Sequence, residues 1–531
     1  MDKNEKHLID MIQSYLKREN YSINKEDLTL QLLSNQSFPS VKSITDSLDY
    51  FGVKNIAVSI PKSALNQLPG NFIAVMKERG QGIVLVSQSA KGIKLFKTDG
   101  TREKLDPDAF CERWTGTIIA IEGETENVSK ARLTIESALI PLGIITIGAI
   151  LSNVLEFNLQ GLIYAVLSTI GIGVSYYLVQ EDLGVHNATT AKICNSANAN
   201  ISCEQVVKSN NSRLFKIFSL SDISITYFTS LLSIMALLGF NPYFFGLLSV
   251  LSIPVVLYSL YSQAFLLKKW CPLCLVVGAV LMSQFINSLA GTAPLLPELL
   301  FSVKALAVIS VTYLFWLYLK SMIKDRQELR QTKTDFLKFK RTENLFGKML
   351  AENPKGSSAL LDDRLKITFG NPDARLTIYS VTNPLCGYCT DSFKVFDQLL
   401  KTHGSRFKLH VVFSVPTENS EQQSTQIAQR IVELYQQNRD AAYTALSNWY
   451  HEKNAEQWLS KHGLPNDESA FNLLIETKAW CRENDIKGTP TTLIGQYLFP
   501  HAYKPEDLFY LIDDLIEDNT TRLTSAEPVL V

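Results

Sequence analysis

The sequence predicts a multidomain membrane protein: an N-terminal α+β domain, an α-helical transmembrane bundle and a C-terminal α/β domain. Two observations support this prediction. The apolar residues concentrate between about residues 133 and 320, whereas both flanks are mixed and polar. Six of the eight cysteines fall in three close pairs, two of them beside or within the apolar region and one in the C-terminal flank. A chain of 531 residues is long enough for three or four domains.

Composition excludes two broad classes of protein. The chain carries 51 Lys and Arg against 52 Asp and Glu, a net charge of −1, which argues against a basic nucleic-acid binder. Hydrophobic residues make up 46% of the chain and charged residues 19%, so a wholly disordered chain is excluded as well.

The first 129 residues contain no long apolar run. The start, MDKNEKHLIDMIQSYLKREN, has the pattern of an amphipathic helix and lacks the apolar core and small-residue cleavage site of a signal peptide. Alternating or apolar stretches separated by turn residues then predict strands. These stretches are 71–78, 82–88, 92–98 and 116–123.

Six apolar runs follow, each close to the 17–25 residues that a transmembrane helix needs. Buried helices of a soluble core are the alternative, but so many apolar runs in 190 residues favour membrane spans. Lys304 lies near the start of the sixth run, where its side chain can reach the interface. The runs are Leu133–Ser152, Leu162–Gln180, Ile223–Phe240, Tyr243–Leu267, Leu275–Ala290 and Leu300–Leu319.

The remaining chain returns to a polar pattern. Residues 321–352 are charged and favour helix, which predicts a helical linker leaving the membrane. In residues 360–531, segments with the periodicity of strands alternate with segments that have the periodicity of helices. Strands are expected at 365–370, 376–381, 407–415 and 491–499, and helices are expected after Cys389, from about 420 to 485 and at the C-terminal end.

The Cys386-Gly-Tyr-Cys389 motif follows a strand and opens a helix. A helix N-terminus stabilises the thiolate of the first cysteine, and Cys389, one turn away, can resolve a mixed disulfide. The alternative is half of a structural zinc site, which would need a second Cys or His pair nearby. Only Cys481 remains in this domain, and His403 and His410 form no helical pair, so thiol–disulfide chemistry is favoured and no metal is expected.

About a hundred residues later, Lys487-Gly-Thr-Pro490 resembles the proline loop of the thioredoxin superfamily. The lead-in from Asn371 and the long helical insertion resemble its DsbA-like branch. This resemblance implies a thioredoxin fold in which Thr489 and Pro490 pack beside the active-site cysteines and shape a groove for client peptides. A proline in an ordinary loop is the alternative. Cys481 is expected to be a buried structural thiol.

Four further cysteines belong to the apolar region. Cys271 and Cys274 lie where the fourth run ends and the fifth begins, and Cys194 and Cys203 lie in the loop between the second and third runs. Two spans separate that loop from Cys271, so both pairs face the same side of the membrane. The spacing allows exchange between a loop pair and a pair at the mouth of the bundle, whereas a structural Cys194–Cys203 disulfide is the alternative.

The segment from Cys203 to Ser209, preceded by Cys194 and followed two spans later by Cys-Pro-Leu-Cys, resembles the vitamin K epoxide reductase family, whose bacterial members are fused to a thioredoxin-like domain. The resemblance implies a four-helix core formed by the second to fifth runs. It implies that Cys274 faces a quinone and that Cys271 is the exchange partner of Cys274. It also implies that Cys203 attacks the Cys271–Cys274 disulfide and that Cys194 exchanges with the thioredoxin-like domain.

The same resemblance implies that Ser209 forms a hydrogen bond near the quinone, and a helix-capping serine is the alternative. The family often carries an aromatic residue soon after the second cysteine of the motif. Here the segment after Cys274 reads LVVGAVLMSQF, with no Tyr in its first turns. The residue that contacts the quinone carbonyl is therefore left unassigned.

The N-terminal segments from LQLLSNQSFPSVKSITDSLDY to Phe110-Cys-Glu-Arg-Trp-Thr-Gly resemble the papain-like peptidase domain of bacteriocin exporters. Such a peptidase needs a Cys nucleophile and a His base. Cys111 lies near the end of the domain, His7 is its only histidine, and Gln81 stands where the family has its catalytic His. Asp99 alone has no base to orient. We therefore expect a non-catalytic relative that binds peptides.

These inferences give four domains and one function. The boundaries are 1–128 for the papain-like domain, 129–322 for the transmembrane domain, 323–358 for the linker and 359–531 for the thioredoxin-like domain. The expected function is a thiol–disulfide oxidoreductase of the bacterial cytoplasmic membrane. It passes electrons from dithiols of exported proteins through the three cysteine pairs to menaquinone or ubiquinone, with a peptide exporter as a possible partner.

Three alternatives stay open: a reductase working in the opposite direction, a vitamin K epoxide reductase with a small-molecule reductant, and a non-enzymatic receptor or assembly factor for exported peptides. Membrane orientation is a point of conflict. The cysteine-bearing side carries most of the loop Lys and Arg residues, which by the positive-inside rule places it in the cytoplasm. Disulfide chemistry places the cysteines outside the cytoplasm, and we expect that arrangement.

Overall fold

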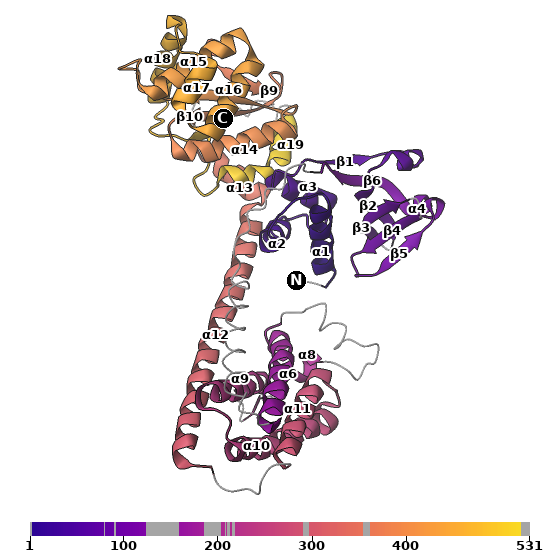
Figure 1. The fold of residues 1–531 in the computed structure, drawn as a ribbon. Helices are drawn as coiled ribbons and strands as arrows, with labels where there is room; N and C mark the ends of the chain where they lie inside the picture. The colour runs from indigo at the N-terminus through magenta and orange to yellow at the C-terminus, as the bar shows by residue number, and fades with distance from the viewer. Residues whose placement is uncertain are drawn as a thin grey trace, which may run out of the picture. The chain divides into compact units, whose positions relative to one another are not determined.

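The computed structural model describes residues 3–78, 80–89, 92–123, 159–184, 203–207, 209, 213–214, 218–289, 297–353 and 362–521. The chain divides into two compact units (Figure 1). One contains residues 1–129 together with 330–531, and the other contains residues 130–329. The first expected span, 133–152, and Cys194 lie outside the described residues.

Three helices begin the N-terminal domain: α1 (Lys3–Arg18), α2 (Lys25–Leu33) and α3 (Val41–Tyr50). The expected amphipathic pattern of α1 is confirmed, because Leu8, Ile12 and Leu16 are buried at helical spacing. Side chains satisfy the free amides at the starts of the other two helices. Asn24 caps α2, and Ser40 forms a capping box with Ser43 at the start of α3.

The N-terminal sheet is antiparallel and has the strand order β1-β6-β2-β3-β4-β5. Helices α1 to α3 cover one face, while α4 (Pro107–Arg113) and the 3₁₀ helix η1 (Lys62–Gln67) pack on the other. The four expected strands are β2, β3, β4 and β6. The sequence reading missed β1 and β5, the two edges. Bounds are β1 Asn55–Ser59, β2 Asn71–Glu78, β3 Gly80–Ser89, β4 Gly92–Lys97, β5 Arg102–Leu105 and β6 Trp114–Ile121.

Five described helices are long and apolar enough to cross a membrane. They are α6 (Leu159–Asp182), α9 (Leu220–Leu238), α10 (Pro242–Tyr261) with its π-helical continuation η3 (Ser262–Leu267), α11 (Pro272–Leu289) and α12 (Leu299–Lys340). Helix α6 packs against α9 and α11, and α10 packs against α11. The close approach of α6 to α9 needs Gly171, because a Cβ there would lie 2.5 Å from the Phe228 ring.

Between α6 and α9 the described chain contains short elements only. Helix α8 (Cys203–Val207) packs against α6 and α11, and β7 (Arg213–Leu214) pairs with β8 (Phe218–Ser219). These elements lie at the end of the bundle where α6 ends and α9 and α11 begin.

Helix α12 joins the sixth expected span to the expected helical linker. Residues 299–340 form one continuous helix. The reason is local, because this stretch contains no Gly or Pro to break the backbone hydrogen bonds. Within the membrane unit, Lys320 joins the helix to its neighbours. Its ammonium lies 2.8 Å from the Asp182 carboxylate of α6 and 2.7 Å from the Asp222 carboxylate of α9.

The C-terminal domain has a five-stranded sheet in the order β13-β12-β10-β11-β9. Strands β10 and β11 are parallel and the other pairs are antiparallel. This is the topology expected of a thioredoxin fold. The strands are β9 Ile367–Gly370, β10 Leu376–Thr382, β11 Phe407–Phe413, β12 Thr491–Ile494 and β13 Tyr497–Leu498.

Helices cover both faces of this sheet, and the largest set is inserted between β11 and β12. Helix α14 (Gly387–His403) connects β10 to β11. The inserted helices are α15 (Gln423–Gln437), α16 (Arg439–Glu452), α17 (Ala455–His462) and α18 (Glu468–Glu483). The remaining elements are α13 (Glu343–Ala351) and η5 (Asp363–Leu365) before the sheet, and η6 (Pro505–Tyr510) and α19 (Ile512–Thr521) after it.

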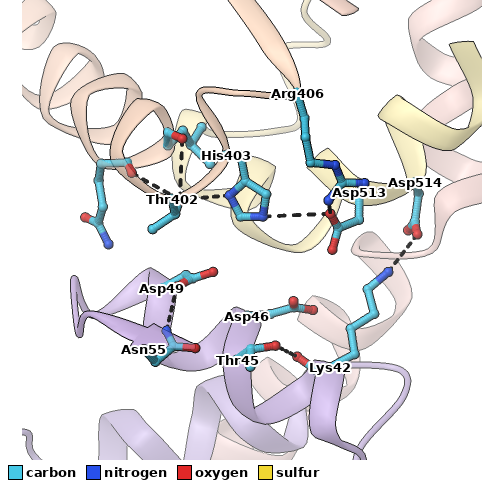
Figure 2. Close-up of polar contacts among 12 residues, drawn as sticks. Lys42, Thr45, Asp46, Asp49, Asn55, Thr402, His403, Arg406, Asp513 and Asp514 are labelled. Atoms are coloured by element: carbon cyan, nitrogen blue, oxygen red, sulfur yellow. Dashed lines mark hydrogen bonds and ion pairs between the residues drawn. The ribbon is translucent and has the colours of Figure 1, made fainter. Parts of the chain in front are cut away.

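The N-terminal and C-terminal domains belong to one compact unit and meet along a polar seam, which we define as the contacts of α2 and α3 with Arg341, α14, η6 and α19. Figure 2 shows the part of this seam where α3 lies near the end of α14 and the start of α19. Arg341 is buried, lies 3.6 Å from the centre of the Tyr510 ring and donates to Gln31. At the edge of the seam, Lys42 forms an ion pair with Asp514 at 2.9 Å.

Candidate functional site

The C-terminal pair, Cys386 and Cys389, begins helix α14. Cys386 is the N-cap residue, and its sulfur accepts a hydrogen bond from the Cys389 amide at 3.4 Å. An N-cap normally uses a side-chain oxygen in this role, so the thiol here replaces it and sits where the helix dipole favours negative charge. The position of the motif at a helix start therefore makes Cys386 the more acidic of its two cysteines.

The two thiols of the C-terminal pair have opposite pKa shifts. Partial burial raises the pKa of Cys386, but hydrogen bonds from the Cys389 thiol and amide outweigh it, and the net pKa lies below the ordinary value. Burial, followed by the hydrogen bond with Cys386, raises the pKa of Cys389. Cys386 is half-buried whereas Cys389 is only 1% exposed. Cys386 is thus the thiol suited to attack, and Cys389 the thiol suited to resolve.

The structure places Thr489 and Pro490 beside this pair. The Thr489 carbonyl accepts a hydrogen bond from the Cys386 thiol at 3.4 Å, and the Thr489–Pro490 peptide bond is cis. On the open side of the motif, Leu385 is 49% exposed and Tyr388 is 78% exposed. These two side chains form an exposed, largely apolar surface next to the reactive sulfur.

The inserted helix α16 supports the motif from behind. The Trp449 indole donates to the carbonyl of Pro384 at 2.8 Å, and the Tyr450 ring stacks on Phe393 of α14 at 4.6 Å. Lys453, which ends α16 in the left-handed conformation, reaches the Cys386 carbonyl at 3.5 Å. The insertion therefore fixes the turn that carries Cys386 and is part of the site.

The membrane pair, Cys271 and Cys274, repeats this local geometry at the start of α11. The Cys274 amide donates to the Cys271 sulfur at 3.3 Å, and Pro272 occupies the first helical position, where its missing amide costs nothing. The Gln263 side chain of the π-helical turn accepts from the Cys271 amide at 2.9 Å. Cys271 is fully buried, whereas Cys274 is partly exposed.

Cys274 lines an apolar cavity of about 410 Å³ between α6, α9, α10 and α11. Its rim includes Leu251, Leu275 and Met282, each at least 37% exposed, so the cavity opens on the outer surface of the bundle. The polar side chains in the lining are few, as is typical of sites for apolar ligands. Besides Cys274 they are Ser224, Tyr227, Ser252 and Ser259.

Apart from Cys274, the sequence analysis did not identify the polar residues that line this cavity. The available signal was weak: a Tyr and several Ser on otherwise apolar helices, which is common in membrane proteins.

Cys203 begins α8 and packs into the same hydrophobic cluster as Cys271, with Cys274 at its edge. Cys203 is disulfide-bonded, whereas Cys271 and Cys274 are free thiols. Ser209 follows α8, and its hydroxyl donates to the Val206 carbonyl at 2.8 Å. It does not line the described cavity. The structure therefore brings Cys203 to the membrane pair but shows Ser209 in a capping contact.

The remaining cysteines and the N-terminal residues lie in ordinary surroundings. Cys481 is buried, and burial raises its pKa to about 11, so it is a poor nucleophile. Burial raises the pKa of Cys111, whose sulfur contacts the Lys62 carbonyl. His7 contacts the Thr98 carbonyl at 3.1 Å, and the Asp99 carboxylate accepts from Thr101 in a turn.

Metal ligands do not assemble in the described ranges, where no group of three His, Cys, Asp or Glu side chains could hold a metal ion. The chemistry of the two free pairs is that of thiols. Each pair places two thiols at the start of a helix, one accessible and one buried. This arrangement is that of an oxidoreductase that acts on disulfides.

Comparison with known families agrees with that class. Residues 162–289 match the model of the vitamin K epoxide reductase family, a range that includes Cys194, Cys203, Cys271, Cys274 and the cavity. With the five apolar helices, the match indicates a multi-pass membrane protein containing a domain of this family. No curated protein matches the chain.

Several solved structures are similar to part of the chain. A periplasmic thioredoxin-like protein from Salmonella enterica serovar Typhimurium is 17% identical, with a TM-score of 0.27, over 30% of this chain and 95% of its own. The catalytic domain of Proteus mirabilis ScsC is 18% identical, with a TM-score of 0.27, over 32% and 99%. Oxidised BdbD from Bacillus subtilis is 14% identical, with a TM-score of 0.24, over 32% and 95%.

Proposed function

We propose that the protein oxidises dithiols of exported proteins and passes the electrons to a membrane quinone. The observation that carries this proposal is the position of Cys274, a free thiol at the wall of an apolar cavity that opens toward the lipid-facing surface. A quinone is an apolar, membrane-dissolved oxidant of a size that such a cavity accommodates, and it accepts two electrons and two protons when it is reduced. We treat menaquinone or ubiquinone as the second substrate.

The route begins at the C-terminal pair. A client thiolate attacks the Cys386–Cys389 disulfide at Cys386, a mixed disulfide forms, and the second client thiol displaces Cys386. The client leaves with a new disulfide, and Cys386 and Cys389 are reduced. The low pKa of Cys386 makes it the better leaving group in this step.

The loop pair, Cys194 and Cys203, then oxidises the C-terminal pair by the same exchange, with Cys194 as the entry point. Cys203 in turn attacks the Cys271–Cys274 disulfide. The membrane pair, now two thiols, gives two electrons and two protons to the quinone and returns to the disulfide. Each transfer between cysteine pairs exchanges one disulfide for another, and the last step oxidises two thiols to a disulfide while the quinone is reduced to the quinol. The balance is one client disulfide formed for each quinone reduced.

We assign the other parts of the molecule to this function. The domains are those expected from the sequence, 1–128, 129–322, 323–358 and 359–531, and the redox sites face the extracytoplasmic side of a bacterial cytoplasmic membrane. The N-terminal domain is a non-catalytic papain-like module that binds exported peptides, with a peptide exporter as a partner. The placement of His7 and Cys111 in structural contacts supports its lack of peptidase activity. Ser209 remains a candidate quinone contact through its position after α8.

The experiment is quinone reduction by the purified full chain in detergent, driven by a reduced dithiol client. Cys386→Ala and Cys274→Ala are each expected to abolish turnover, but only Cys386→Ala is expected to abolish exchange with the client. Cys481→Ala is the matched control, because Cys481 is a buried thiol of the same domain, outside the route. Quinone turnover retained in Cys274→Ala contradicts the proposal.

A further inference from the structure

The cavity beside Cys274 lacks a hydrogen-bond donor from α11, the helix that carries the thiol. Below Cys274 the lining residues of α11 are all apolar: Leu275, Val277, Gly278, Ala279, Leu281 and Met282. A carbonyl oxygen held against this helix gains no polar contact from it. Among the lining residues that the structure describes, the side-chain donors for a deeper ligand oxygen come from α9 and α10.

Three of the four hydroxyl groups in the lining have local partners. The Ser252 hydroxyl donates to the Ser249 carbonyl of its own helix at 2.7 Å. Ser224 pairs with the hydroxyl of Ser175 on α6, and Ser259 accepts from Gln263 at 3.1 Å. Ser259 also lies at the level of Cys274, because both line a small second cavity at that end of the bundle.

Tyr227 on α9 differs from these serines. Its hydroxyl lies 3.4 Å from the Gln284 side-chain oxygen, well beyond the usual length of a hydroxyl hydrogen bond. Gln284 in turn donates to Ser168 at 3.1 Å, so the amide stays anchored if the phenol turns away. The phenol also interacts with the Ser249 side chain of α10, whose hydroxyl is already paired with that of Tyr164 at 2.8 Å. Tyr227 is therefore a half-buried donor at the wall of an apolar cavity, and its contact with Gln284 is long.

Tyr227 lies deeper in the bundle than the Cys274 thiol. Helices α9 and α11 start at the same end, where Leu220 and Cys274 line the same small cavity. Tyr227 follows Leu220 by seven residues, which at a rise of 1.5 Å per residue is about 10 Å deeper. One quinone ring fits between a thiol at the upper level and a phenol at the lower one.

We infer that Tyr227 donates a hydrogen bond to the quinone carbonyl farther from Cys274. The inference rests on the proposed function, and it names the residue that orients the electron acceptor in this chain. During reduction, negative charge develops on both quinone oxygens, so a fixed donor at the far oxygen stabilises the reduced form and holds the ring against Cys274. Tyr227 keeps its own proton, because both protons come from the Cys271 and Cys274 thiols.

The test compares Tyr227→Phe with Ser252→Ala in the full chain, with menadione as the probe. Both variants lose one hydroxyl from the same cavity, but the Ser252 hydroxyl is already satisfied by its own helix. For Tyr227→Phe we expect the KM for menadione to rise about three- to tenfold, the range of one hydrogen bond. We also expect the infrared carbonyl band of bound menadione to move toward its unbonded frequency. Ser252→Ala is expected to change neither quantity.

The outcomes separate this inference from the proposed function. Exchange between Cys386 and a client dithiol should be equal in the wild type and both variants, which shows that the chain is folded. If Tyr227→Phe matches Ser252→Ala in KM and in the carbonyl band, the role of Tyr227 is overturned and quinone reduction stands. If the wild type neither binds nor reduces menadione, the proposed function itself fails.

Discussion

The two free Cys-x-x-Cys pairs share one backbone geometry and have opposite exposure. In each pair the amide of the second cysteine donates to the sulfur of the first, at 3.4 Å in the C-terminal pair and 3.3 Å in the membrane pair. In the C-terminal pair the first cysteine is accessible and the second is buried. In the membrane pair Cys271 is buried and Cys274 faces the cavity.

The comparison shows that the Cys-x-x-Cys motif determines the chemistry of the thiols, whereas the packing around the motif determines which partner can reach them. A helix start activates a thiol in either pair. The flank of the C-terminal pair is an exposed apolar surface at Leu385 and Tyr388, which suits a polypeptide. The flank of the membrane pair is an apolar cavity that opens on the outer surface of the bundle, which suits a small lipid-soluble molecule.

The largest effect is expected from removing the resolving cysteine of the C-terminal pair. In Cys389→Ala the Cys386–Cys389 disulfide cannot form, so oxidation of a dithiol client falls to background. With an oxidised client as the probe, the accessible Cys386 attacks the client disulfide, and the mixed disulfide accumulates because the resolving thiol is missing. Non-reducing electrophoresis detects the adduct. Cys386→Ala should give no adduct, and an adduct in that variant would reverse the assignment of the two thiols.

The opposite exposure can be tested with reagents of different polarity on the reduced protein. We expect charged, water-soluble iodoacetate to alkylate Cys386 more than 100-fold faster than Cys481 at pH 7, because burial raises the pKa of Cys481 to about 11. The Cys386 rate should rise with pH, with a midpoint below the ordinary value of 9.0. Cys274 should prefer a lipid-soluble maleimide. Peptide mapping by mass spectrometry measures all three thiols.

Filling the cavity should impair the reaction of the membrane pair and leave that of the C-terminal pair unchanged. A Cβ at Gly278 would contact only Val256, at 3.5 Å, so Gly278→Leu adds a side chain to the cavity wall. We expect the KM for menadione to rise about tenfold or more while client exchange at Cys386 is unchanged. Gly173→Leu on α6 is the control, because no atom lies within 4 Å of a Cβ there. Equal kinetics in the two variants would exclude the cavity as the quinone site.

The other end of α14 lies at the polar seam, where two buried carboxyls meet Asp513, Arg406 and His403 from the C-terminal domain (Figure 2). Burial raises the pKa of Asp46 to about 7 and that of Asp49 to about 6, and nearby Asp513 adds to both shifts. A raised carboxyl pKa means that the protonated form is favoured in the folded state. Stability is therefore lost as pH rises from about 4 to 7.

Asp46→Asn should remove much of that pH dependence. The amide oxygen can still accept from Asn35, which now donates to Asp46 at 2.9 Å. We expect the variant to gain about 1–3 kcal/mol at pH 8 and nothing near pH 4, measured by chemical unfolding of the full chain in detergent. Client exchange at Cys386, at the opposite end of α14, should stay unchanged. A gain that is equal at both pH values would contradict the raised pKa.

The smallest effect is expected at the exposed edge of the same seam. Lys42→Met removes the ion pair with Asp514, in which the lysine side chain is 43% exposed. An exposed ion pair contributes less than about 1 kcal/mol and weakens with salt. The same unfolding measurement should show a small loss at low salt that vanishes at about 1 M salt.

The sequence predicted the positions where local signals are strong. The cysteine spacing, the Thr489–Pro490 loop, four of the six N-terminal strands and the described membrane helices follow from motifs or periodicity. Both missed strands are sheet edges with little buried surface, so their alternation is weak: β1 is NIAVS and β5 is REKL. The helical character of the linker after residue 320 was predicted from its composition, and α12 continues into it as far as Lys340.

Other features depend on tertiary contacts that no local pattern encodes. The exposure of Cys274 and the burial of Cys271 depend on how α10 and α11 pack around one turn. Tyr227 becomes a candidate ligand contact only when α9 and α11 pack against α6 and line the same cavity. The burial of Asp46 and Asp49 likewise has no local signal in the sequence.

The burial of one thiol in each pair has a consequence for oxidative damage. Peroxide converts accessible thiolates stepwise to sulfenic, sulfinic and sulfonic acids, and the last two steps are irreversible in most proteins. Cys389 and Cys271 are shielded from such reagents, so hyperoxidation by aqueous peroxide falls on Cys386. Lipid-soluble electrophiles fall on Cys274 instead. The two ends of the route therefore fail under different stresses, and the lesion found on an inactivated molecule identifies the compartment from which the stress came.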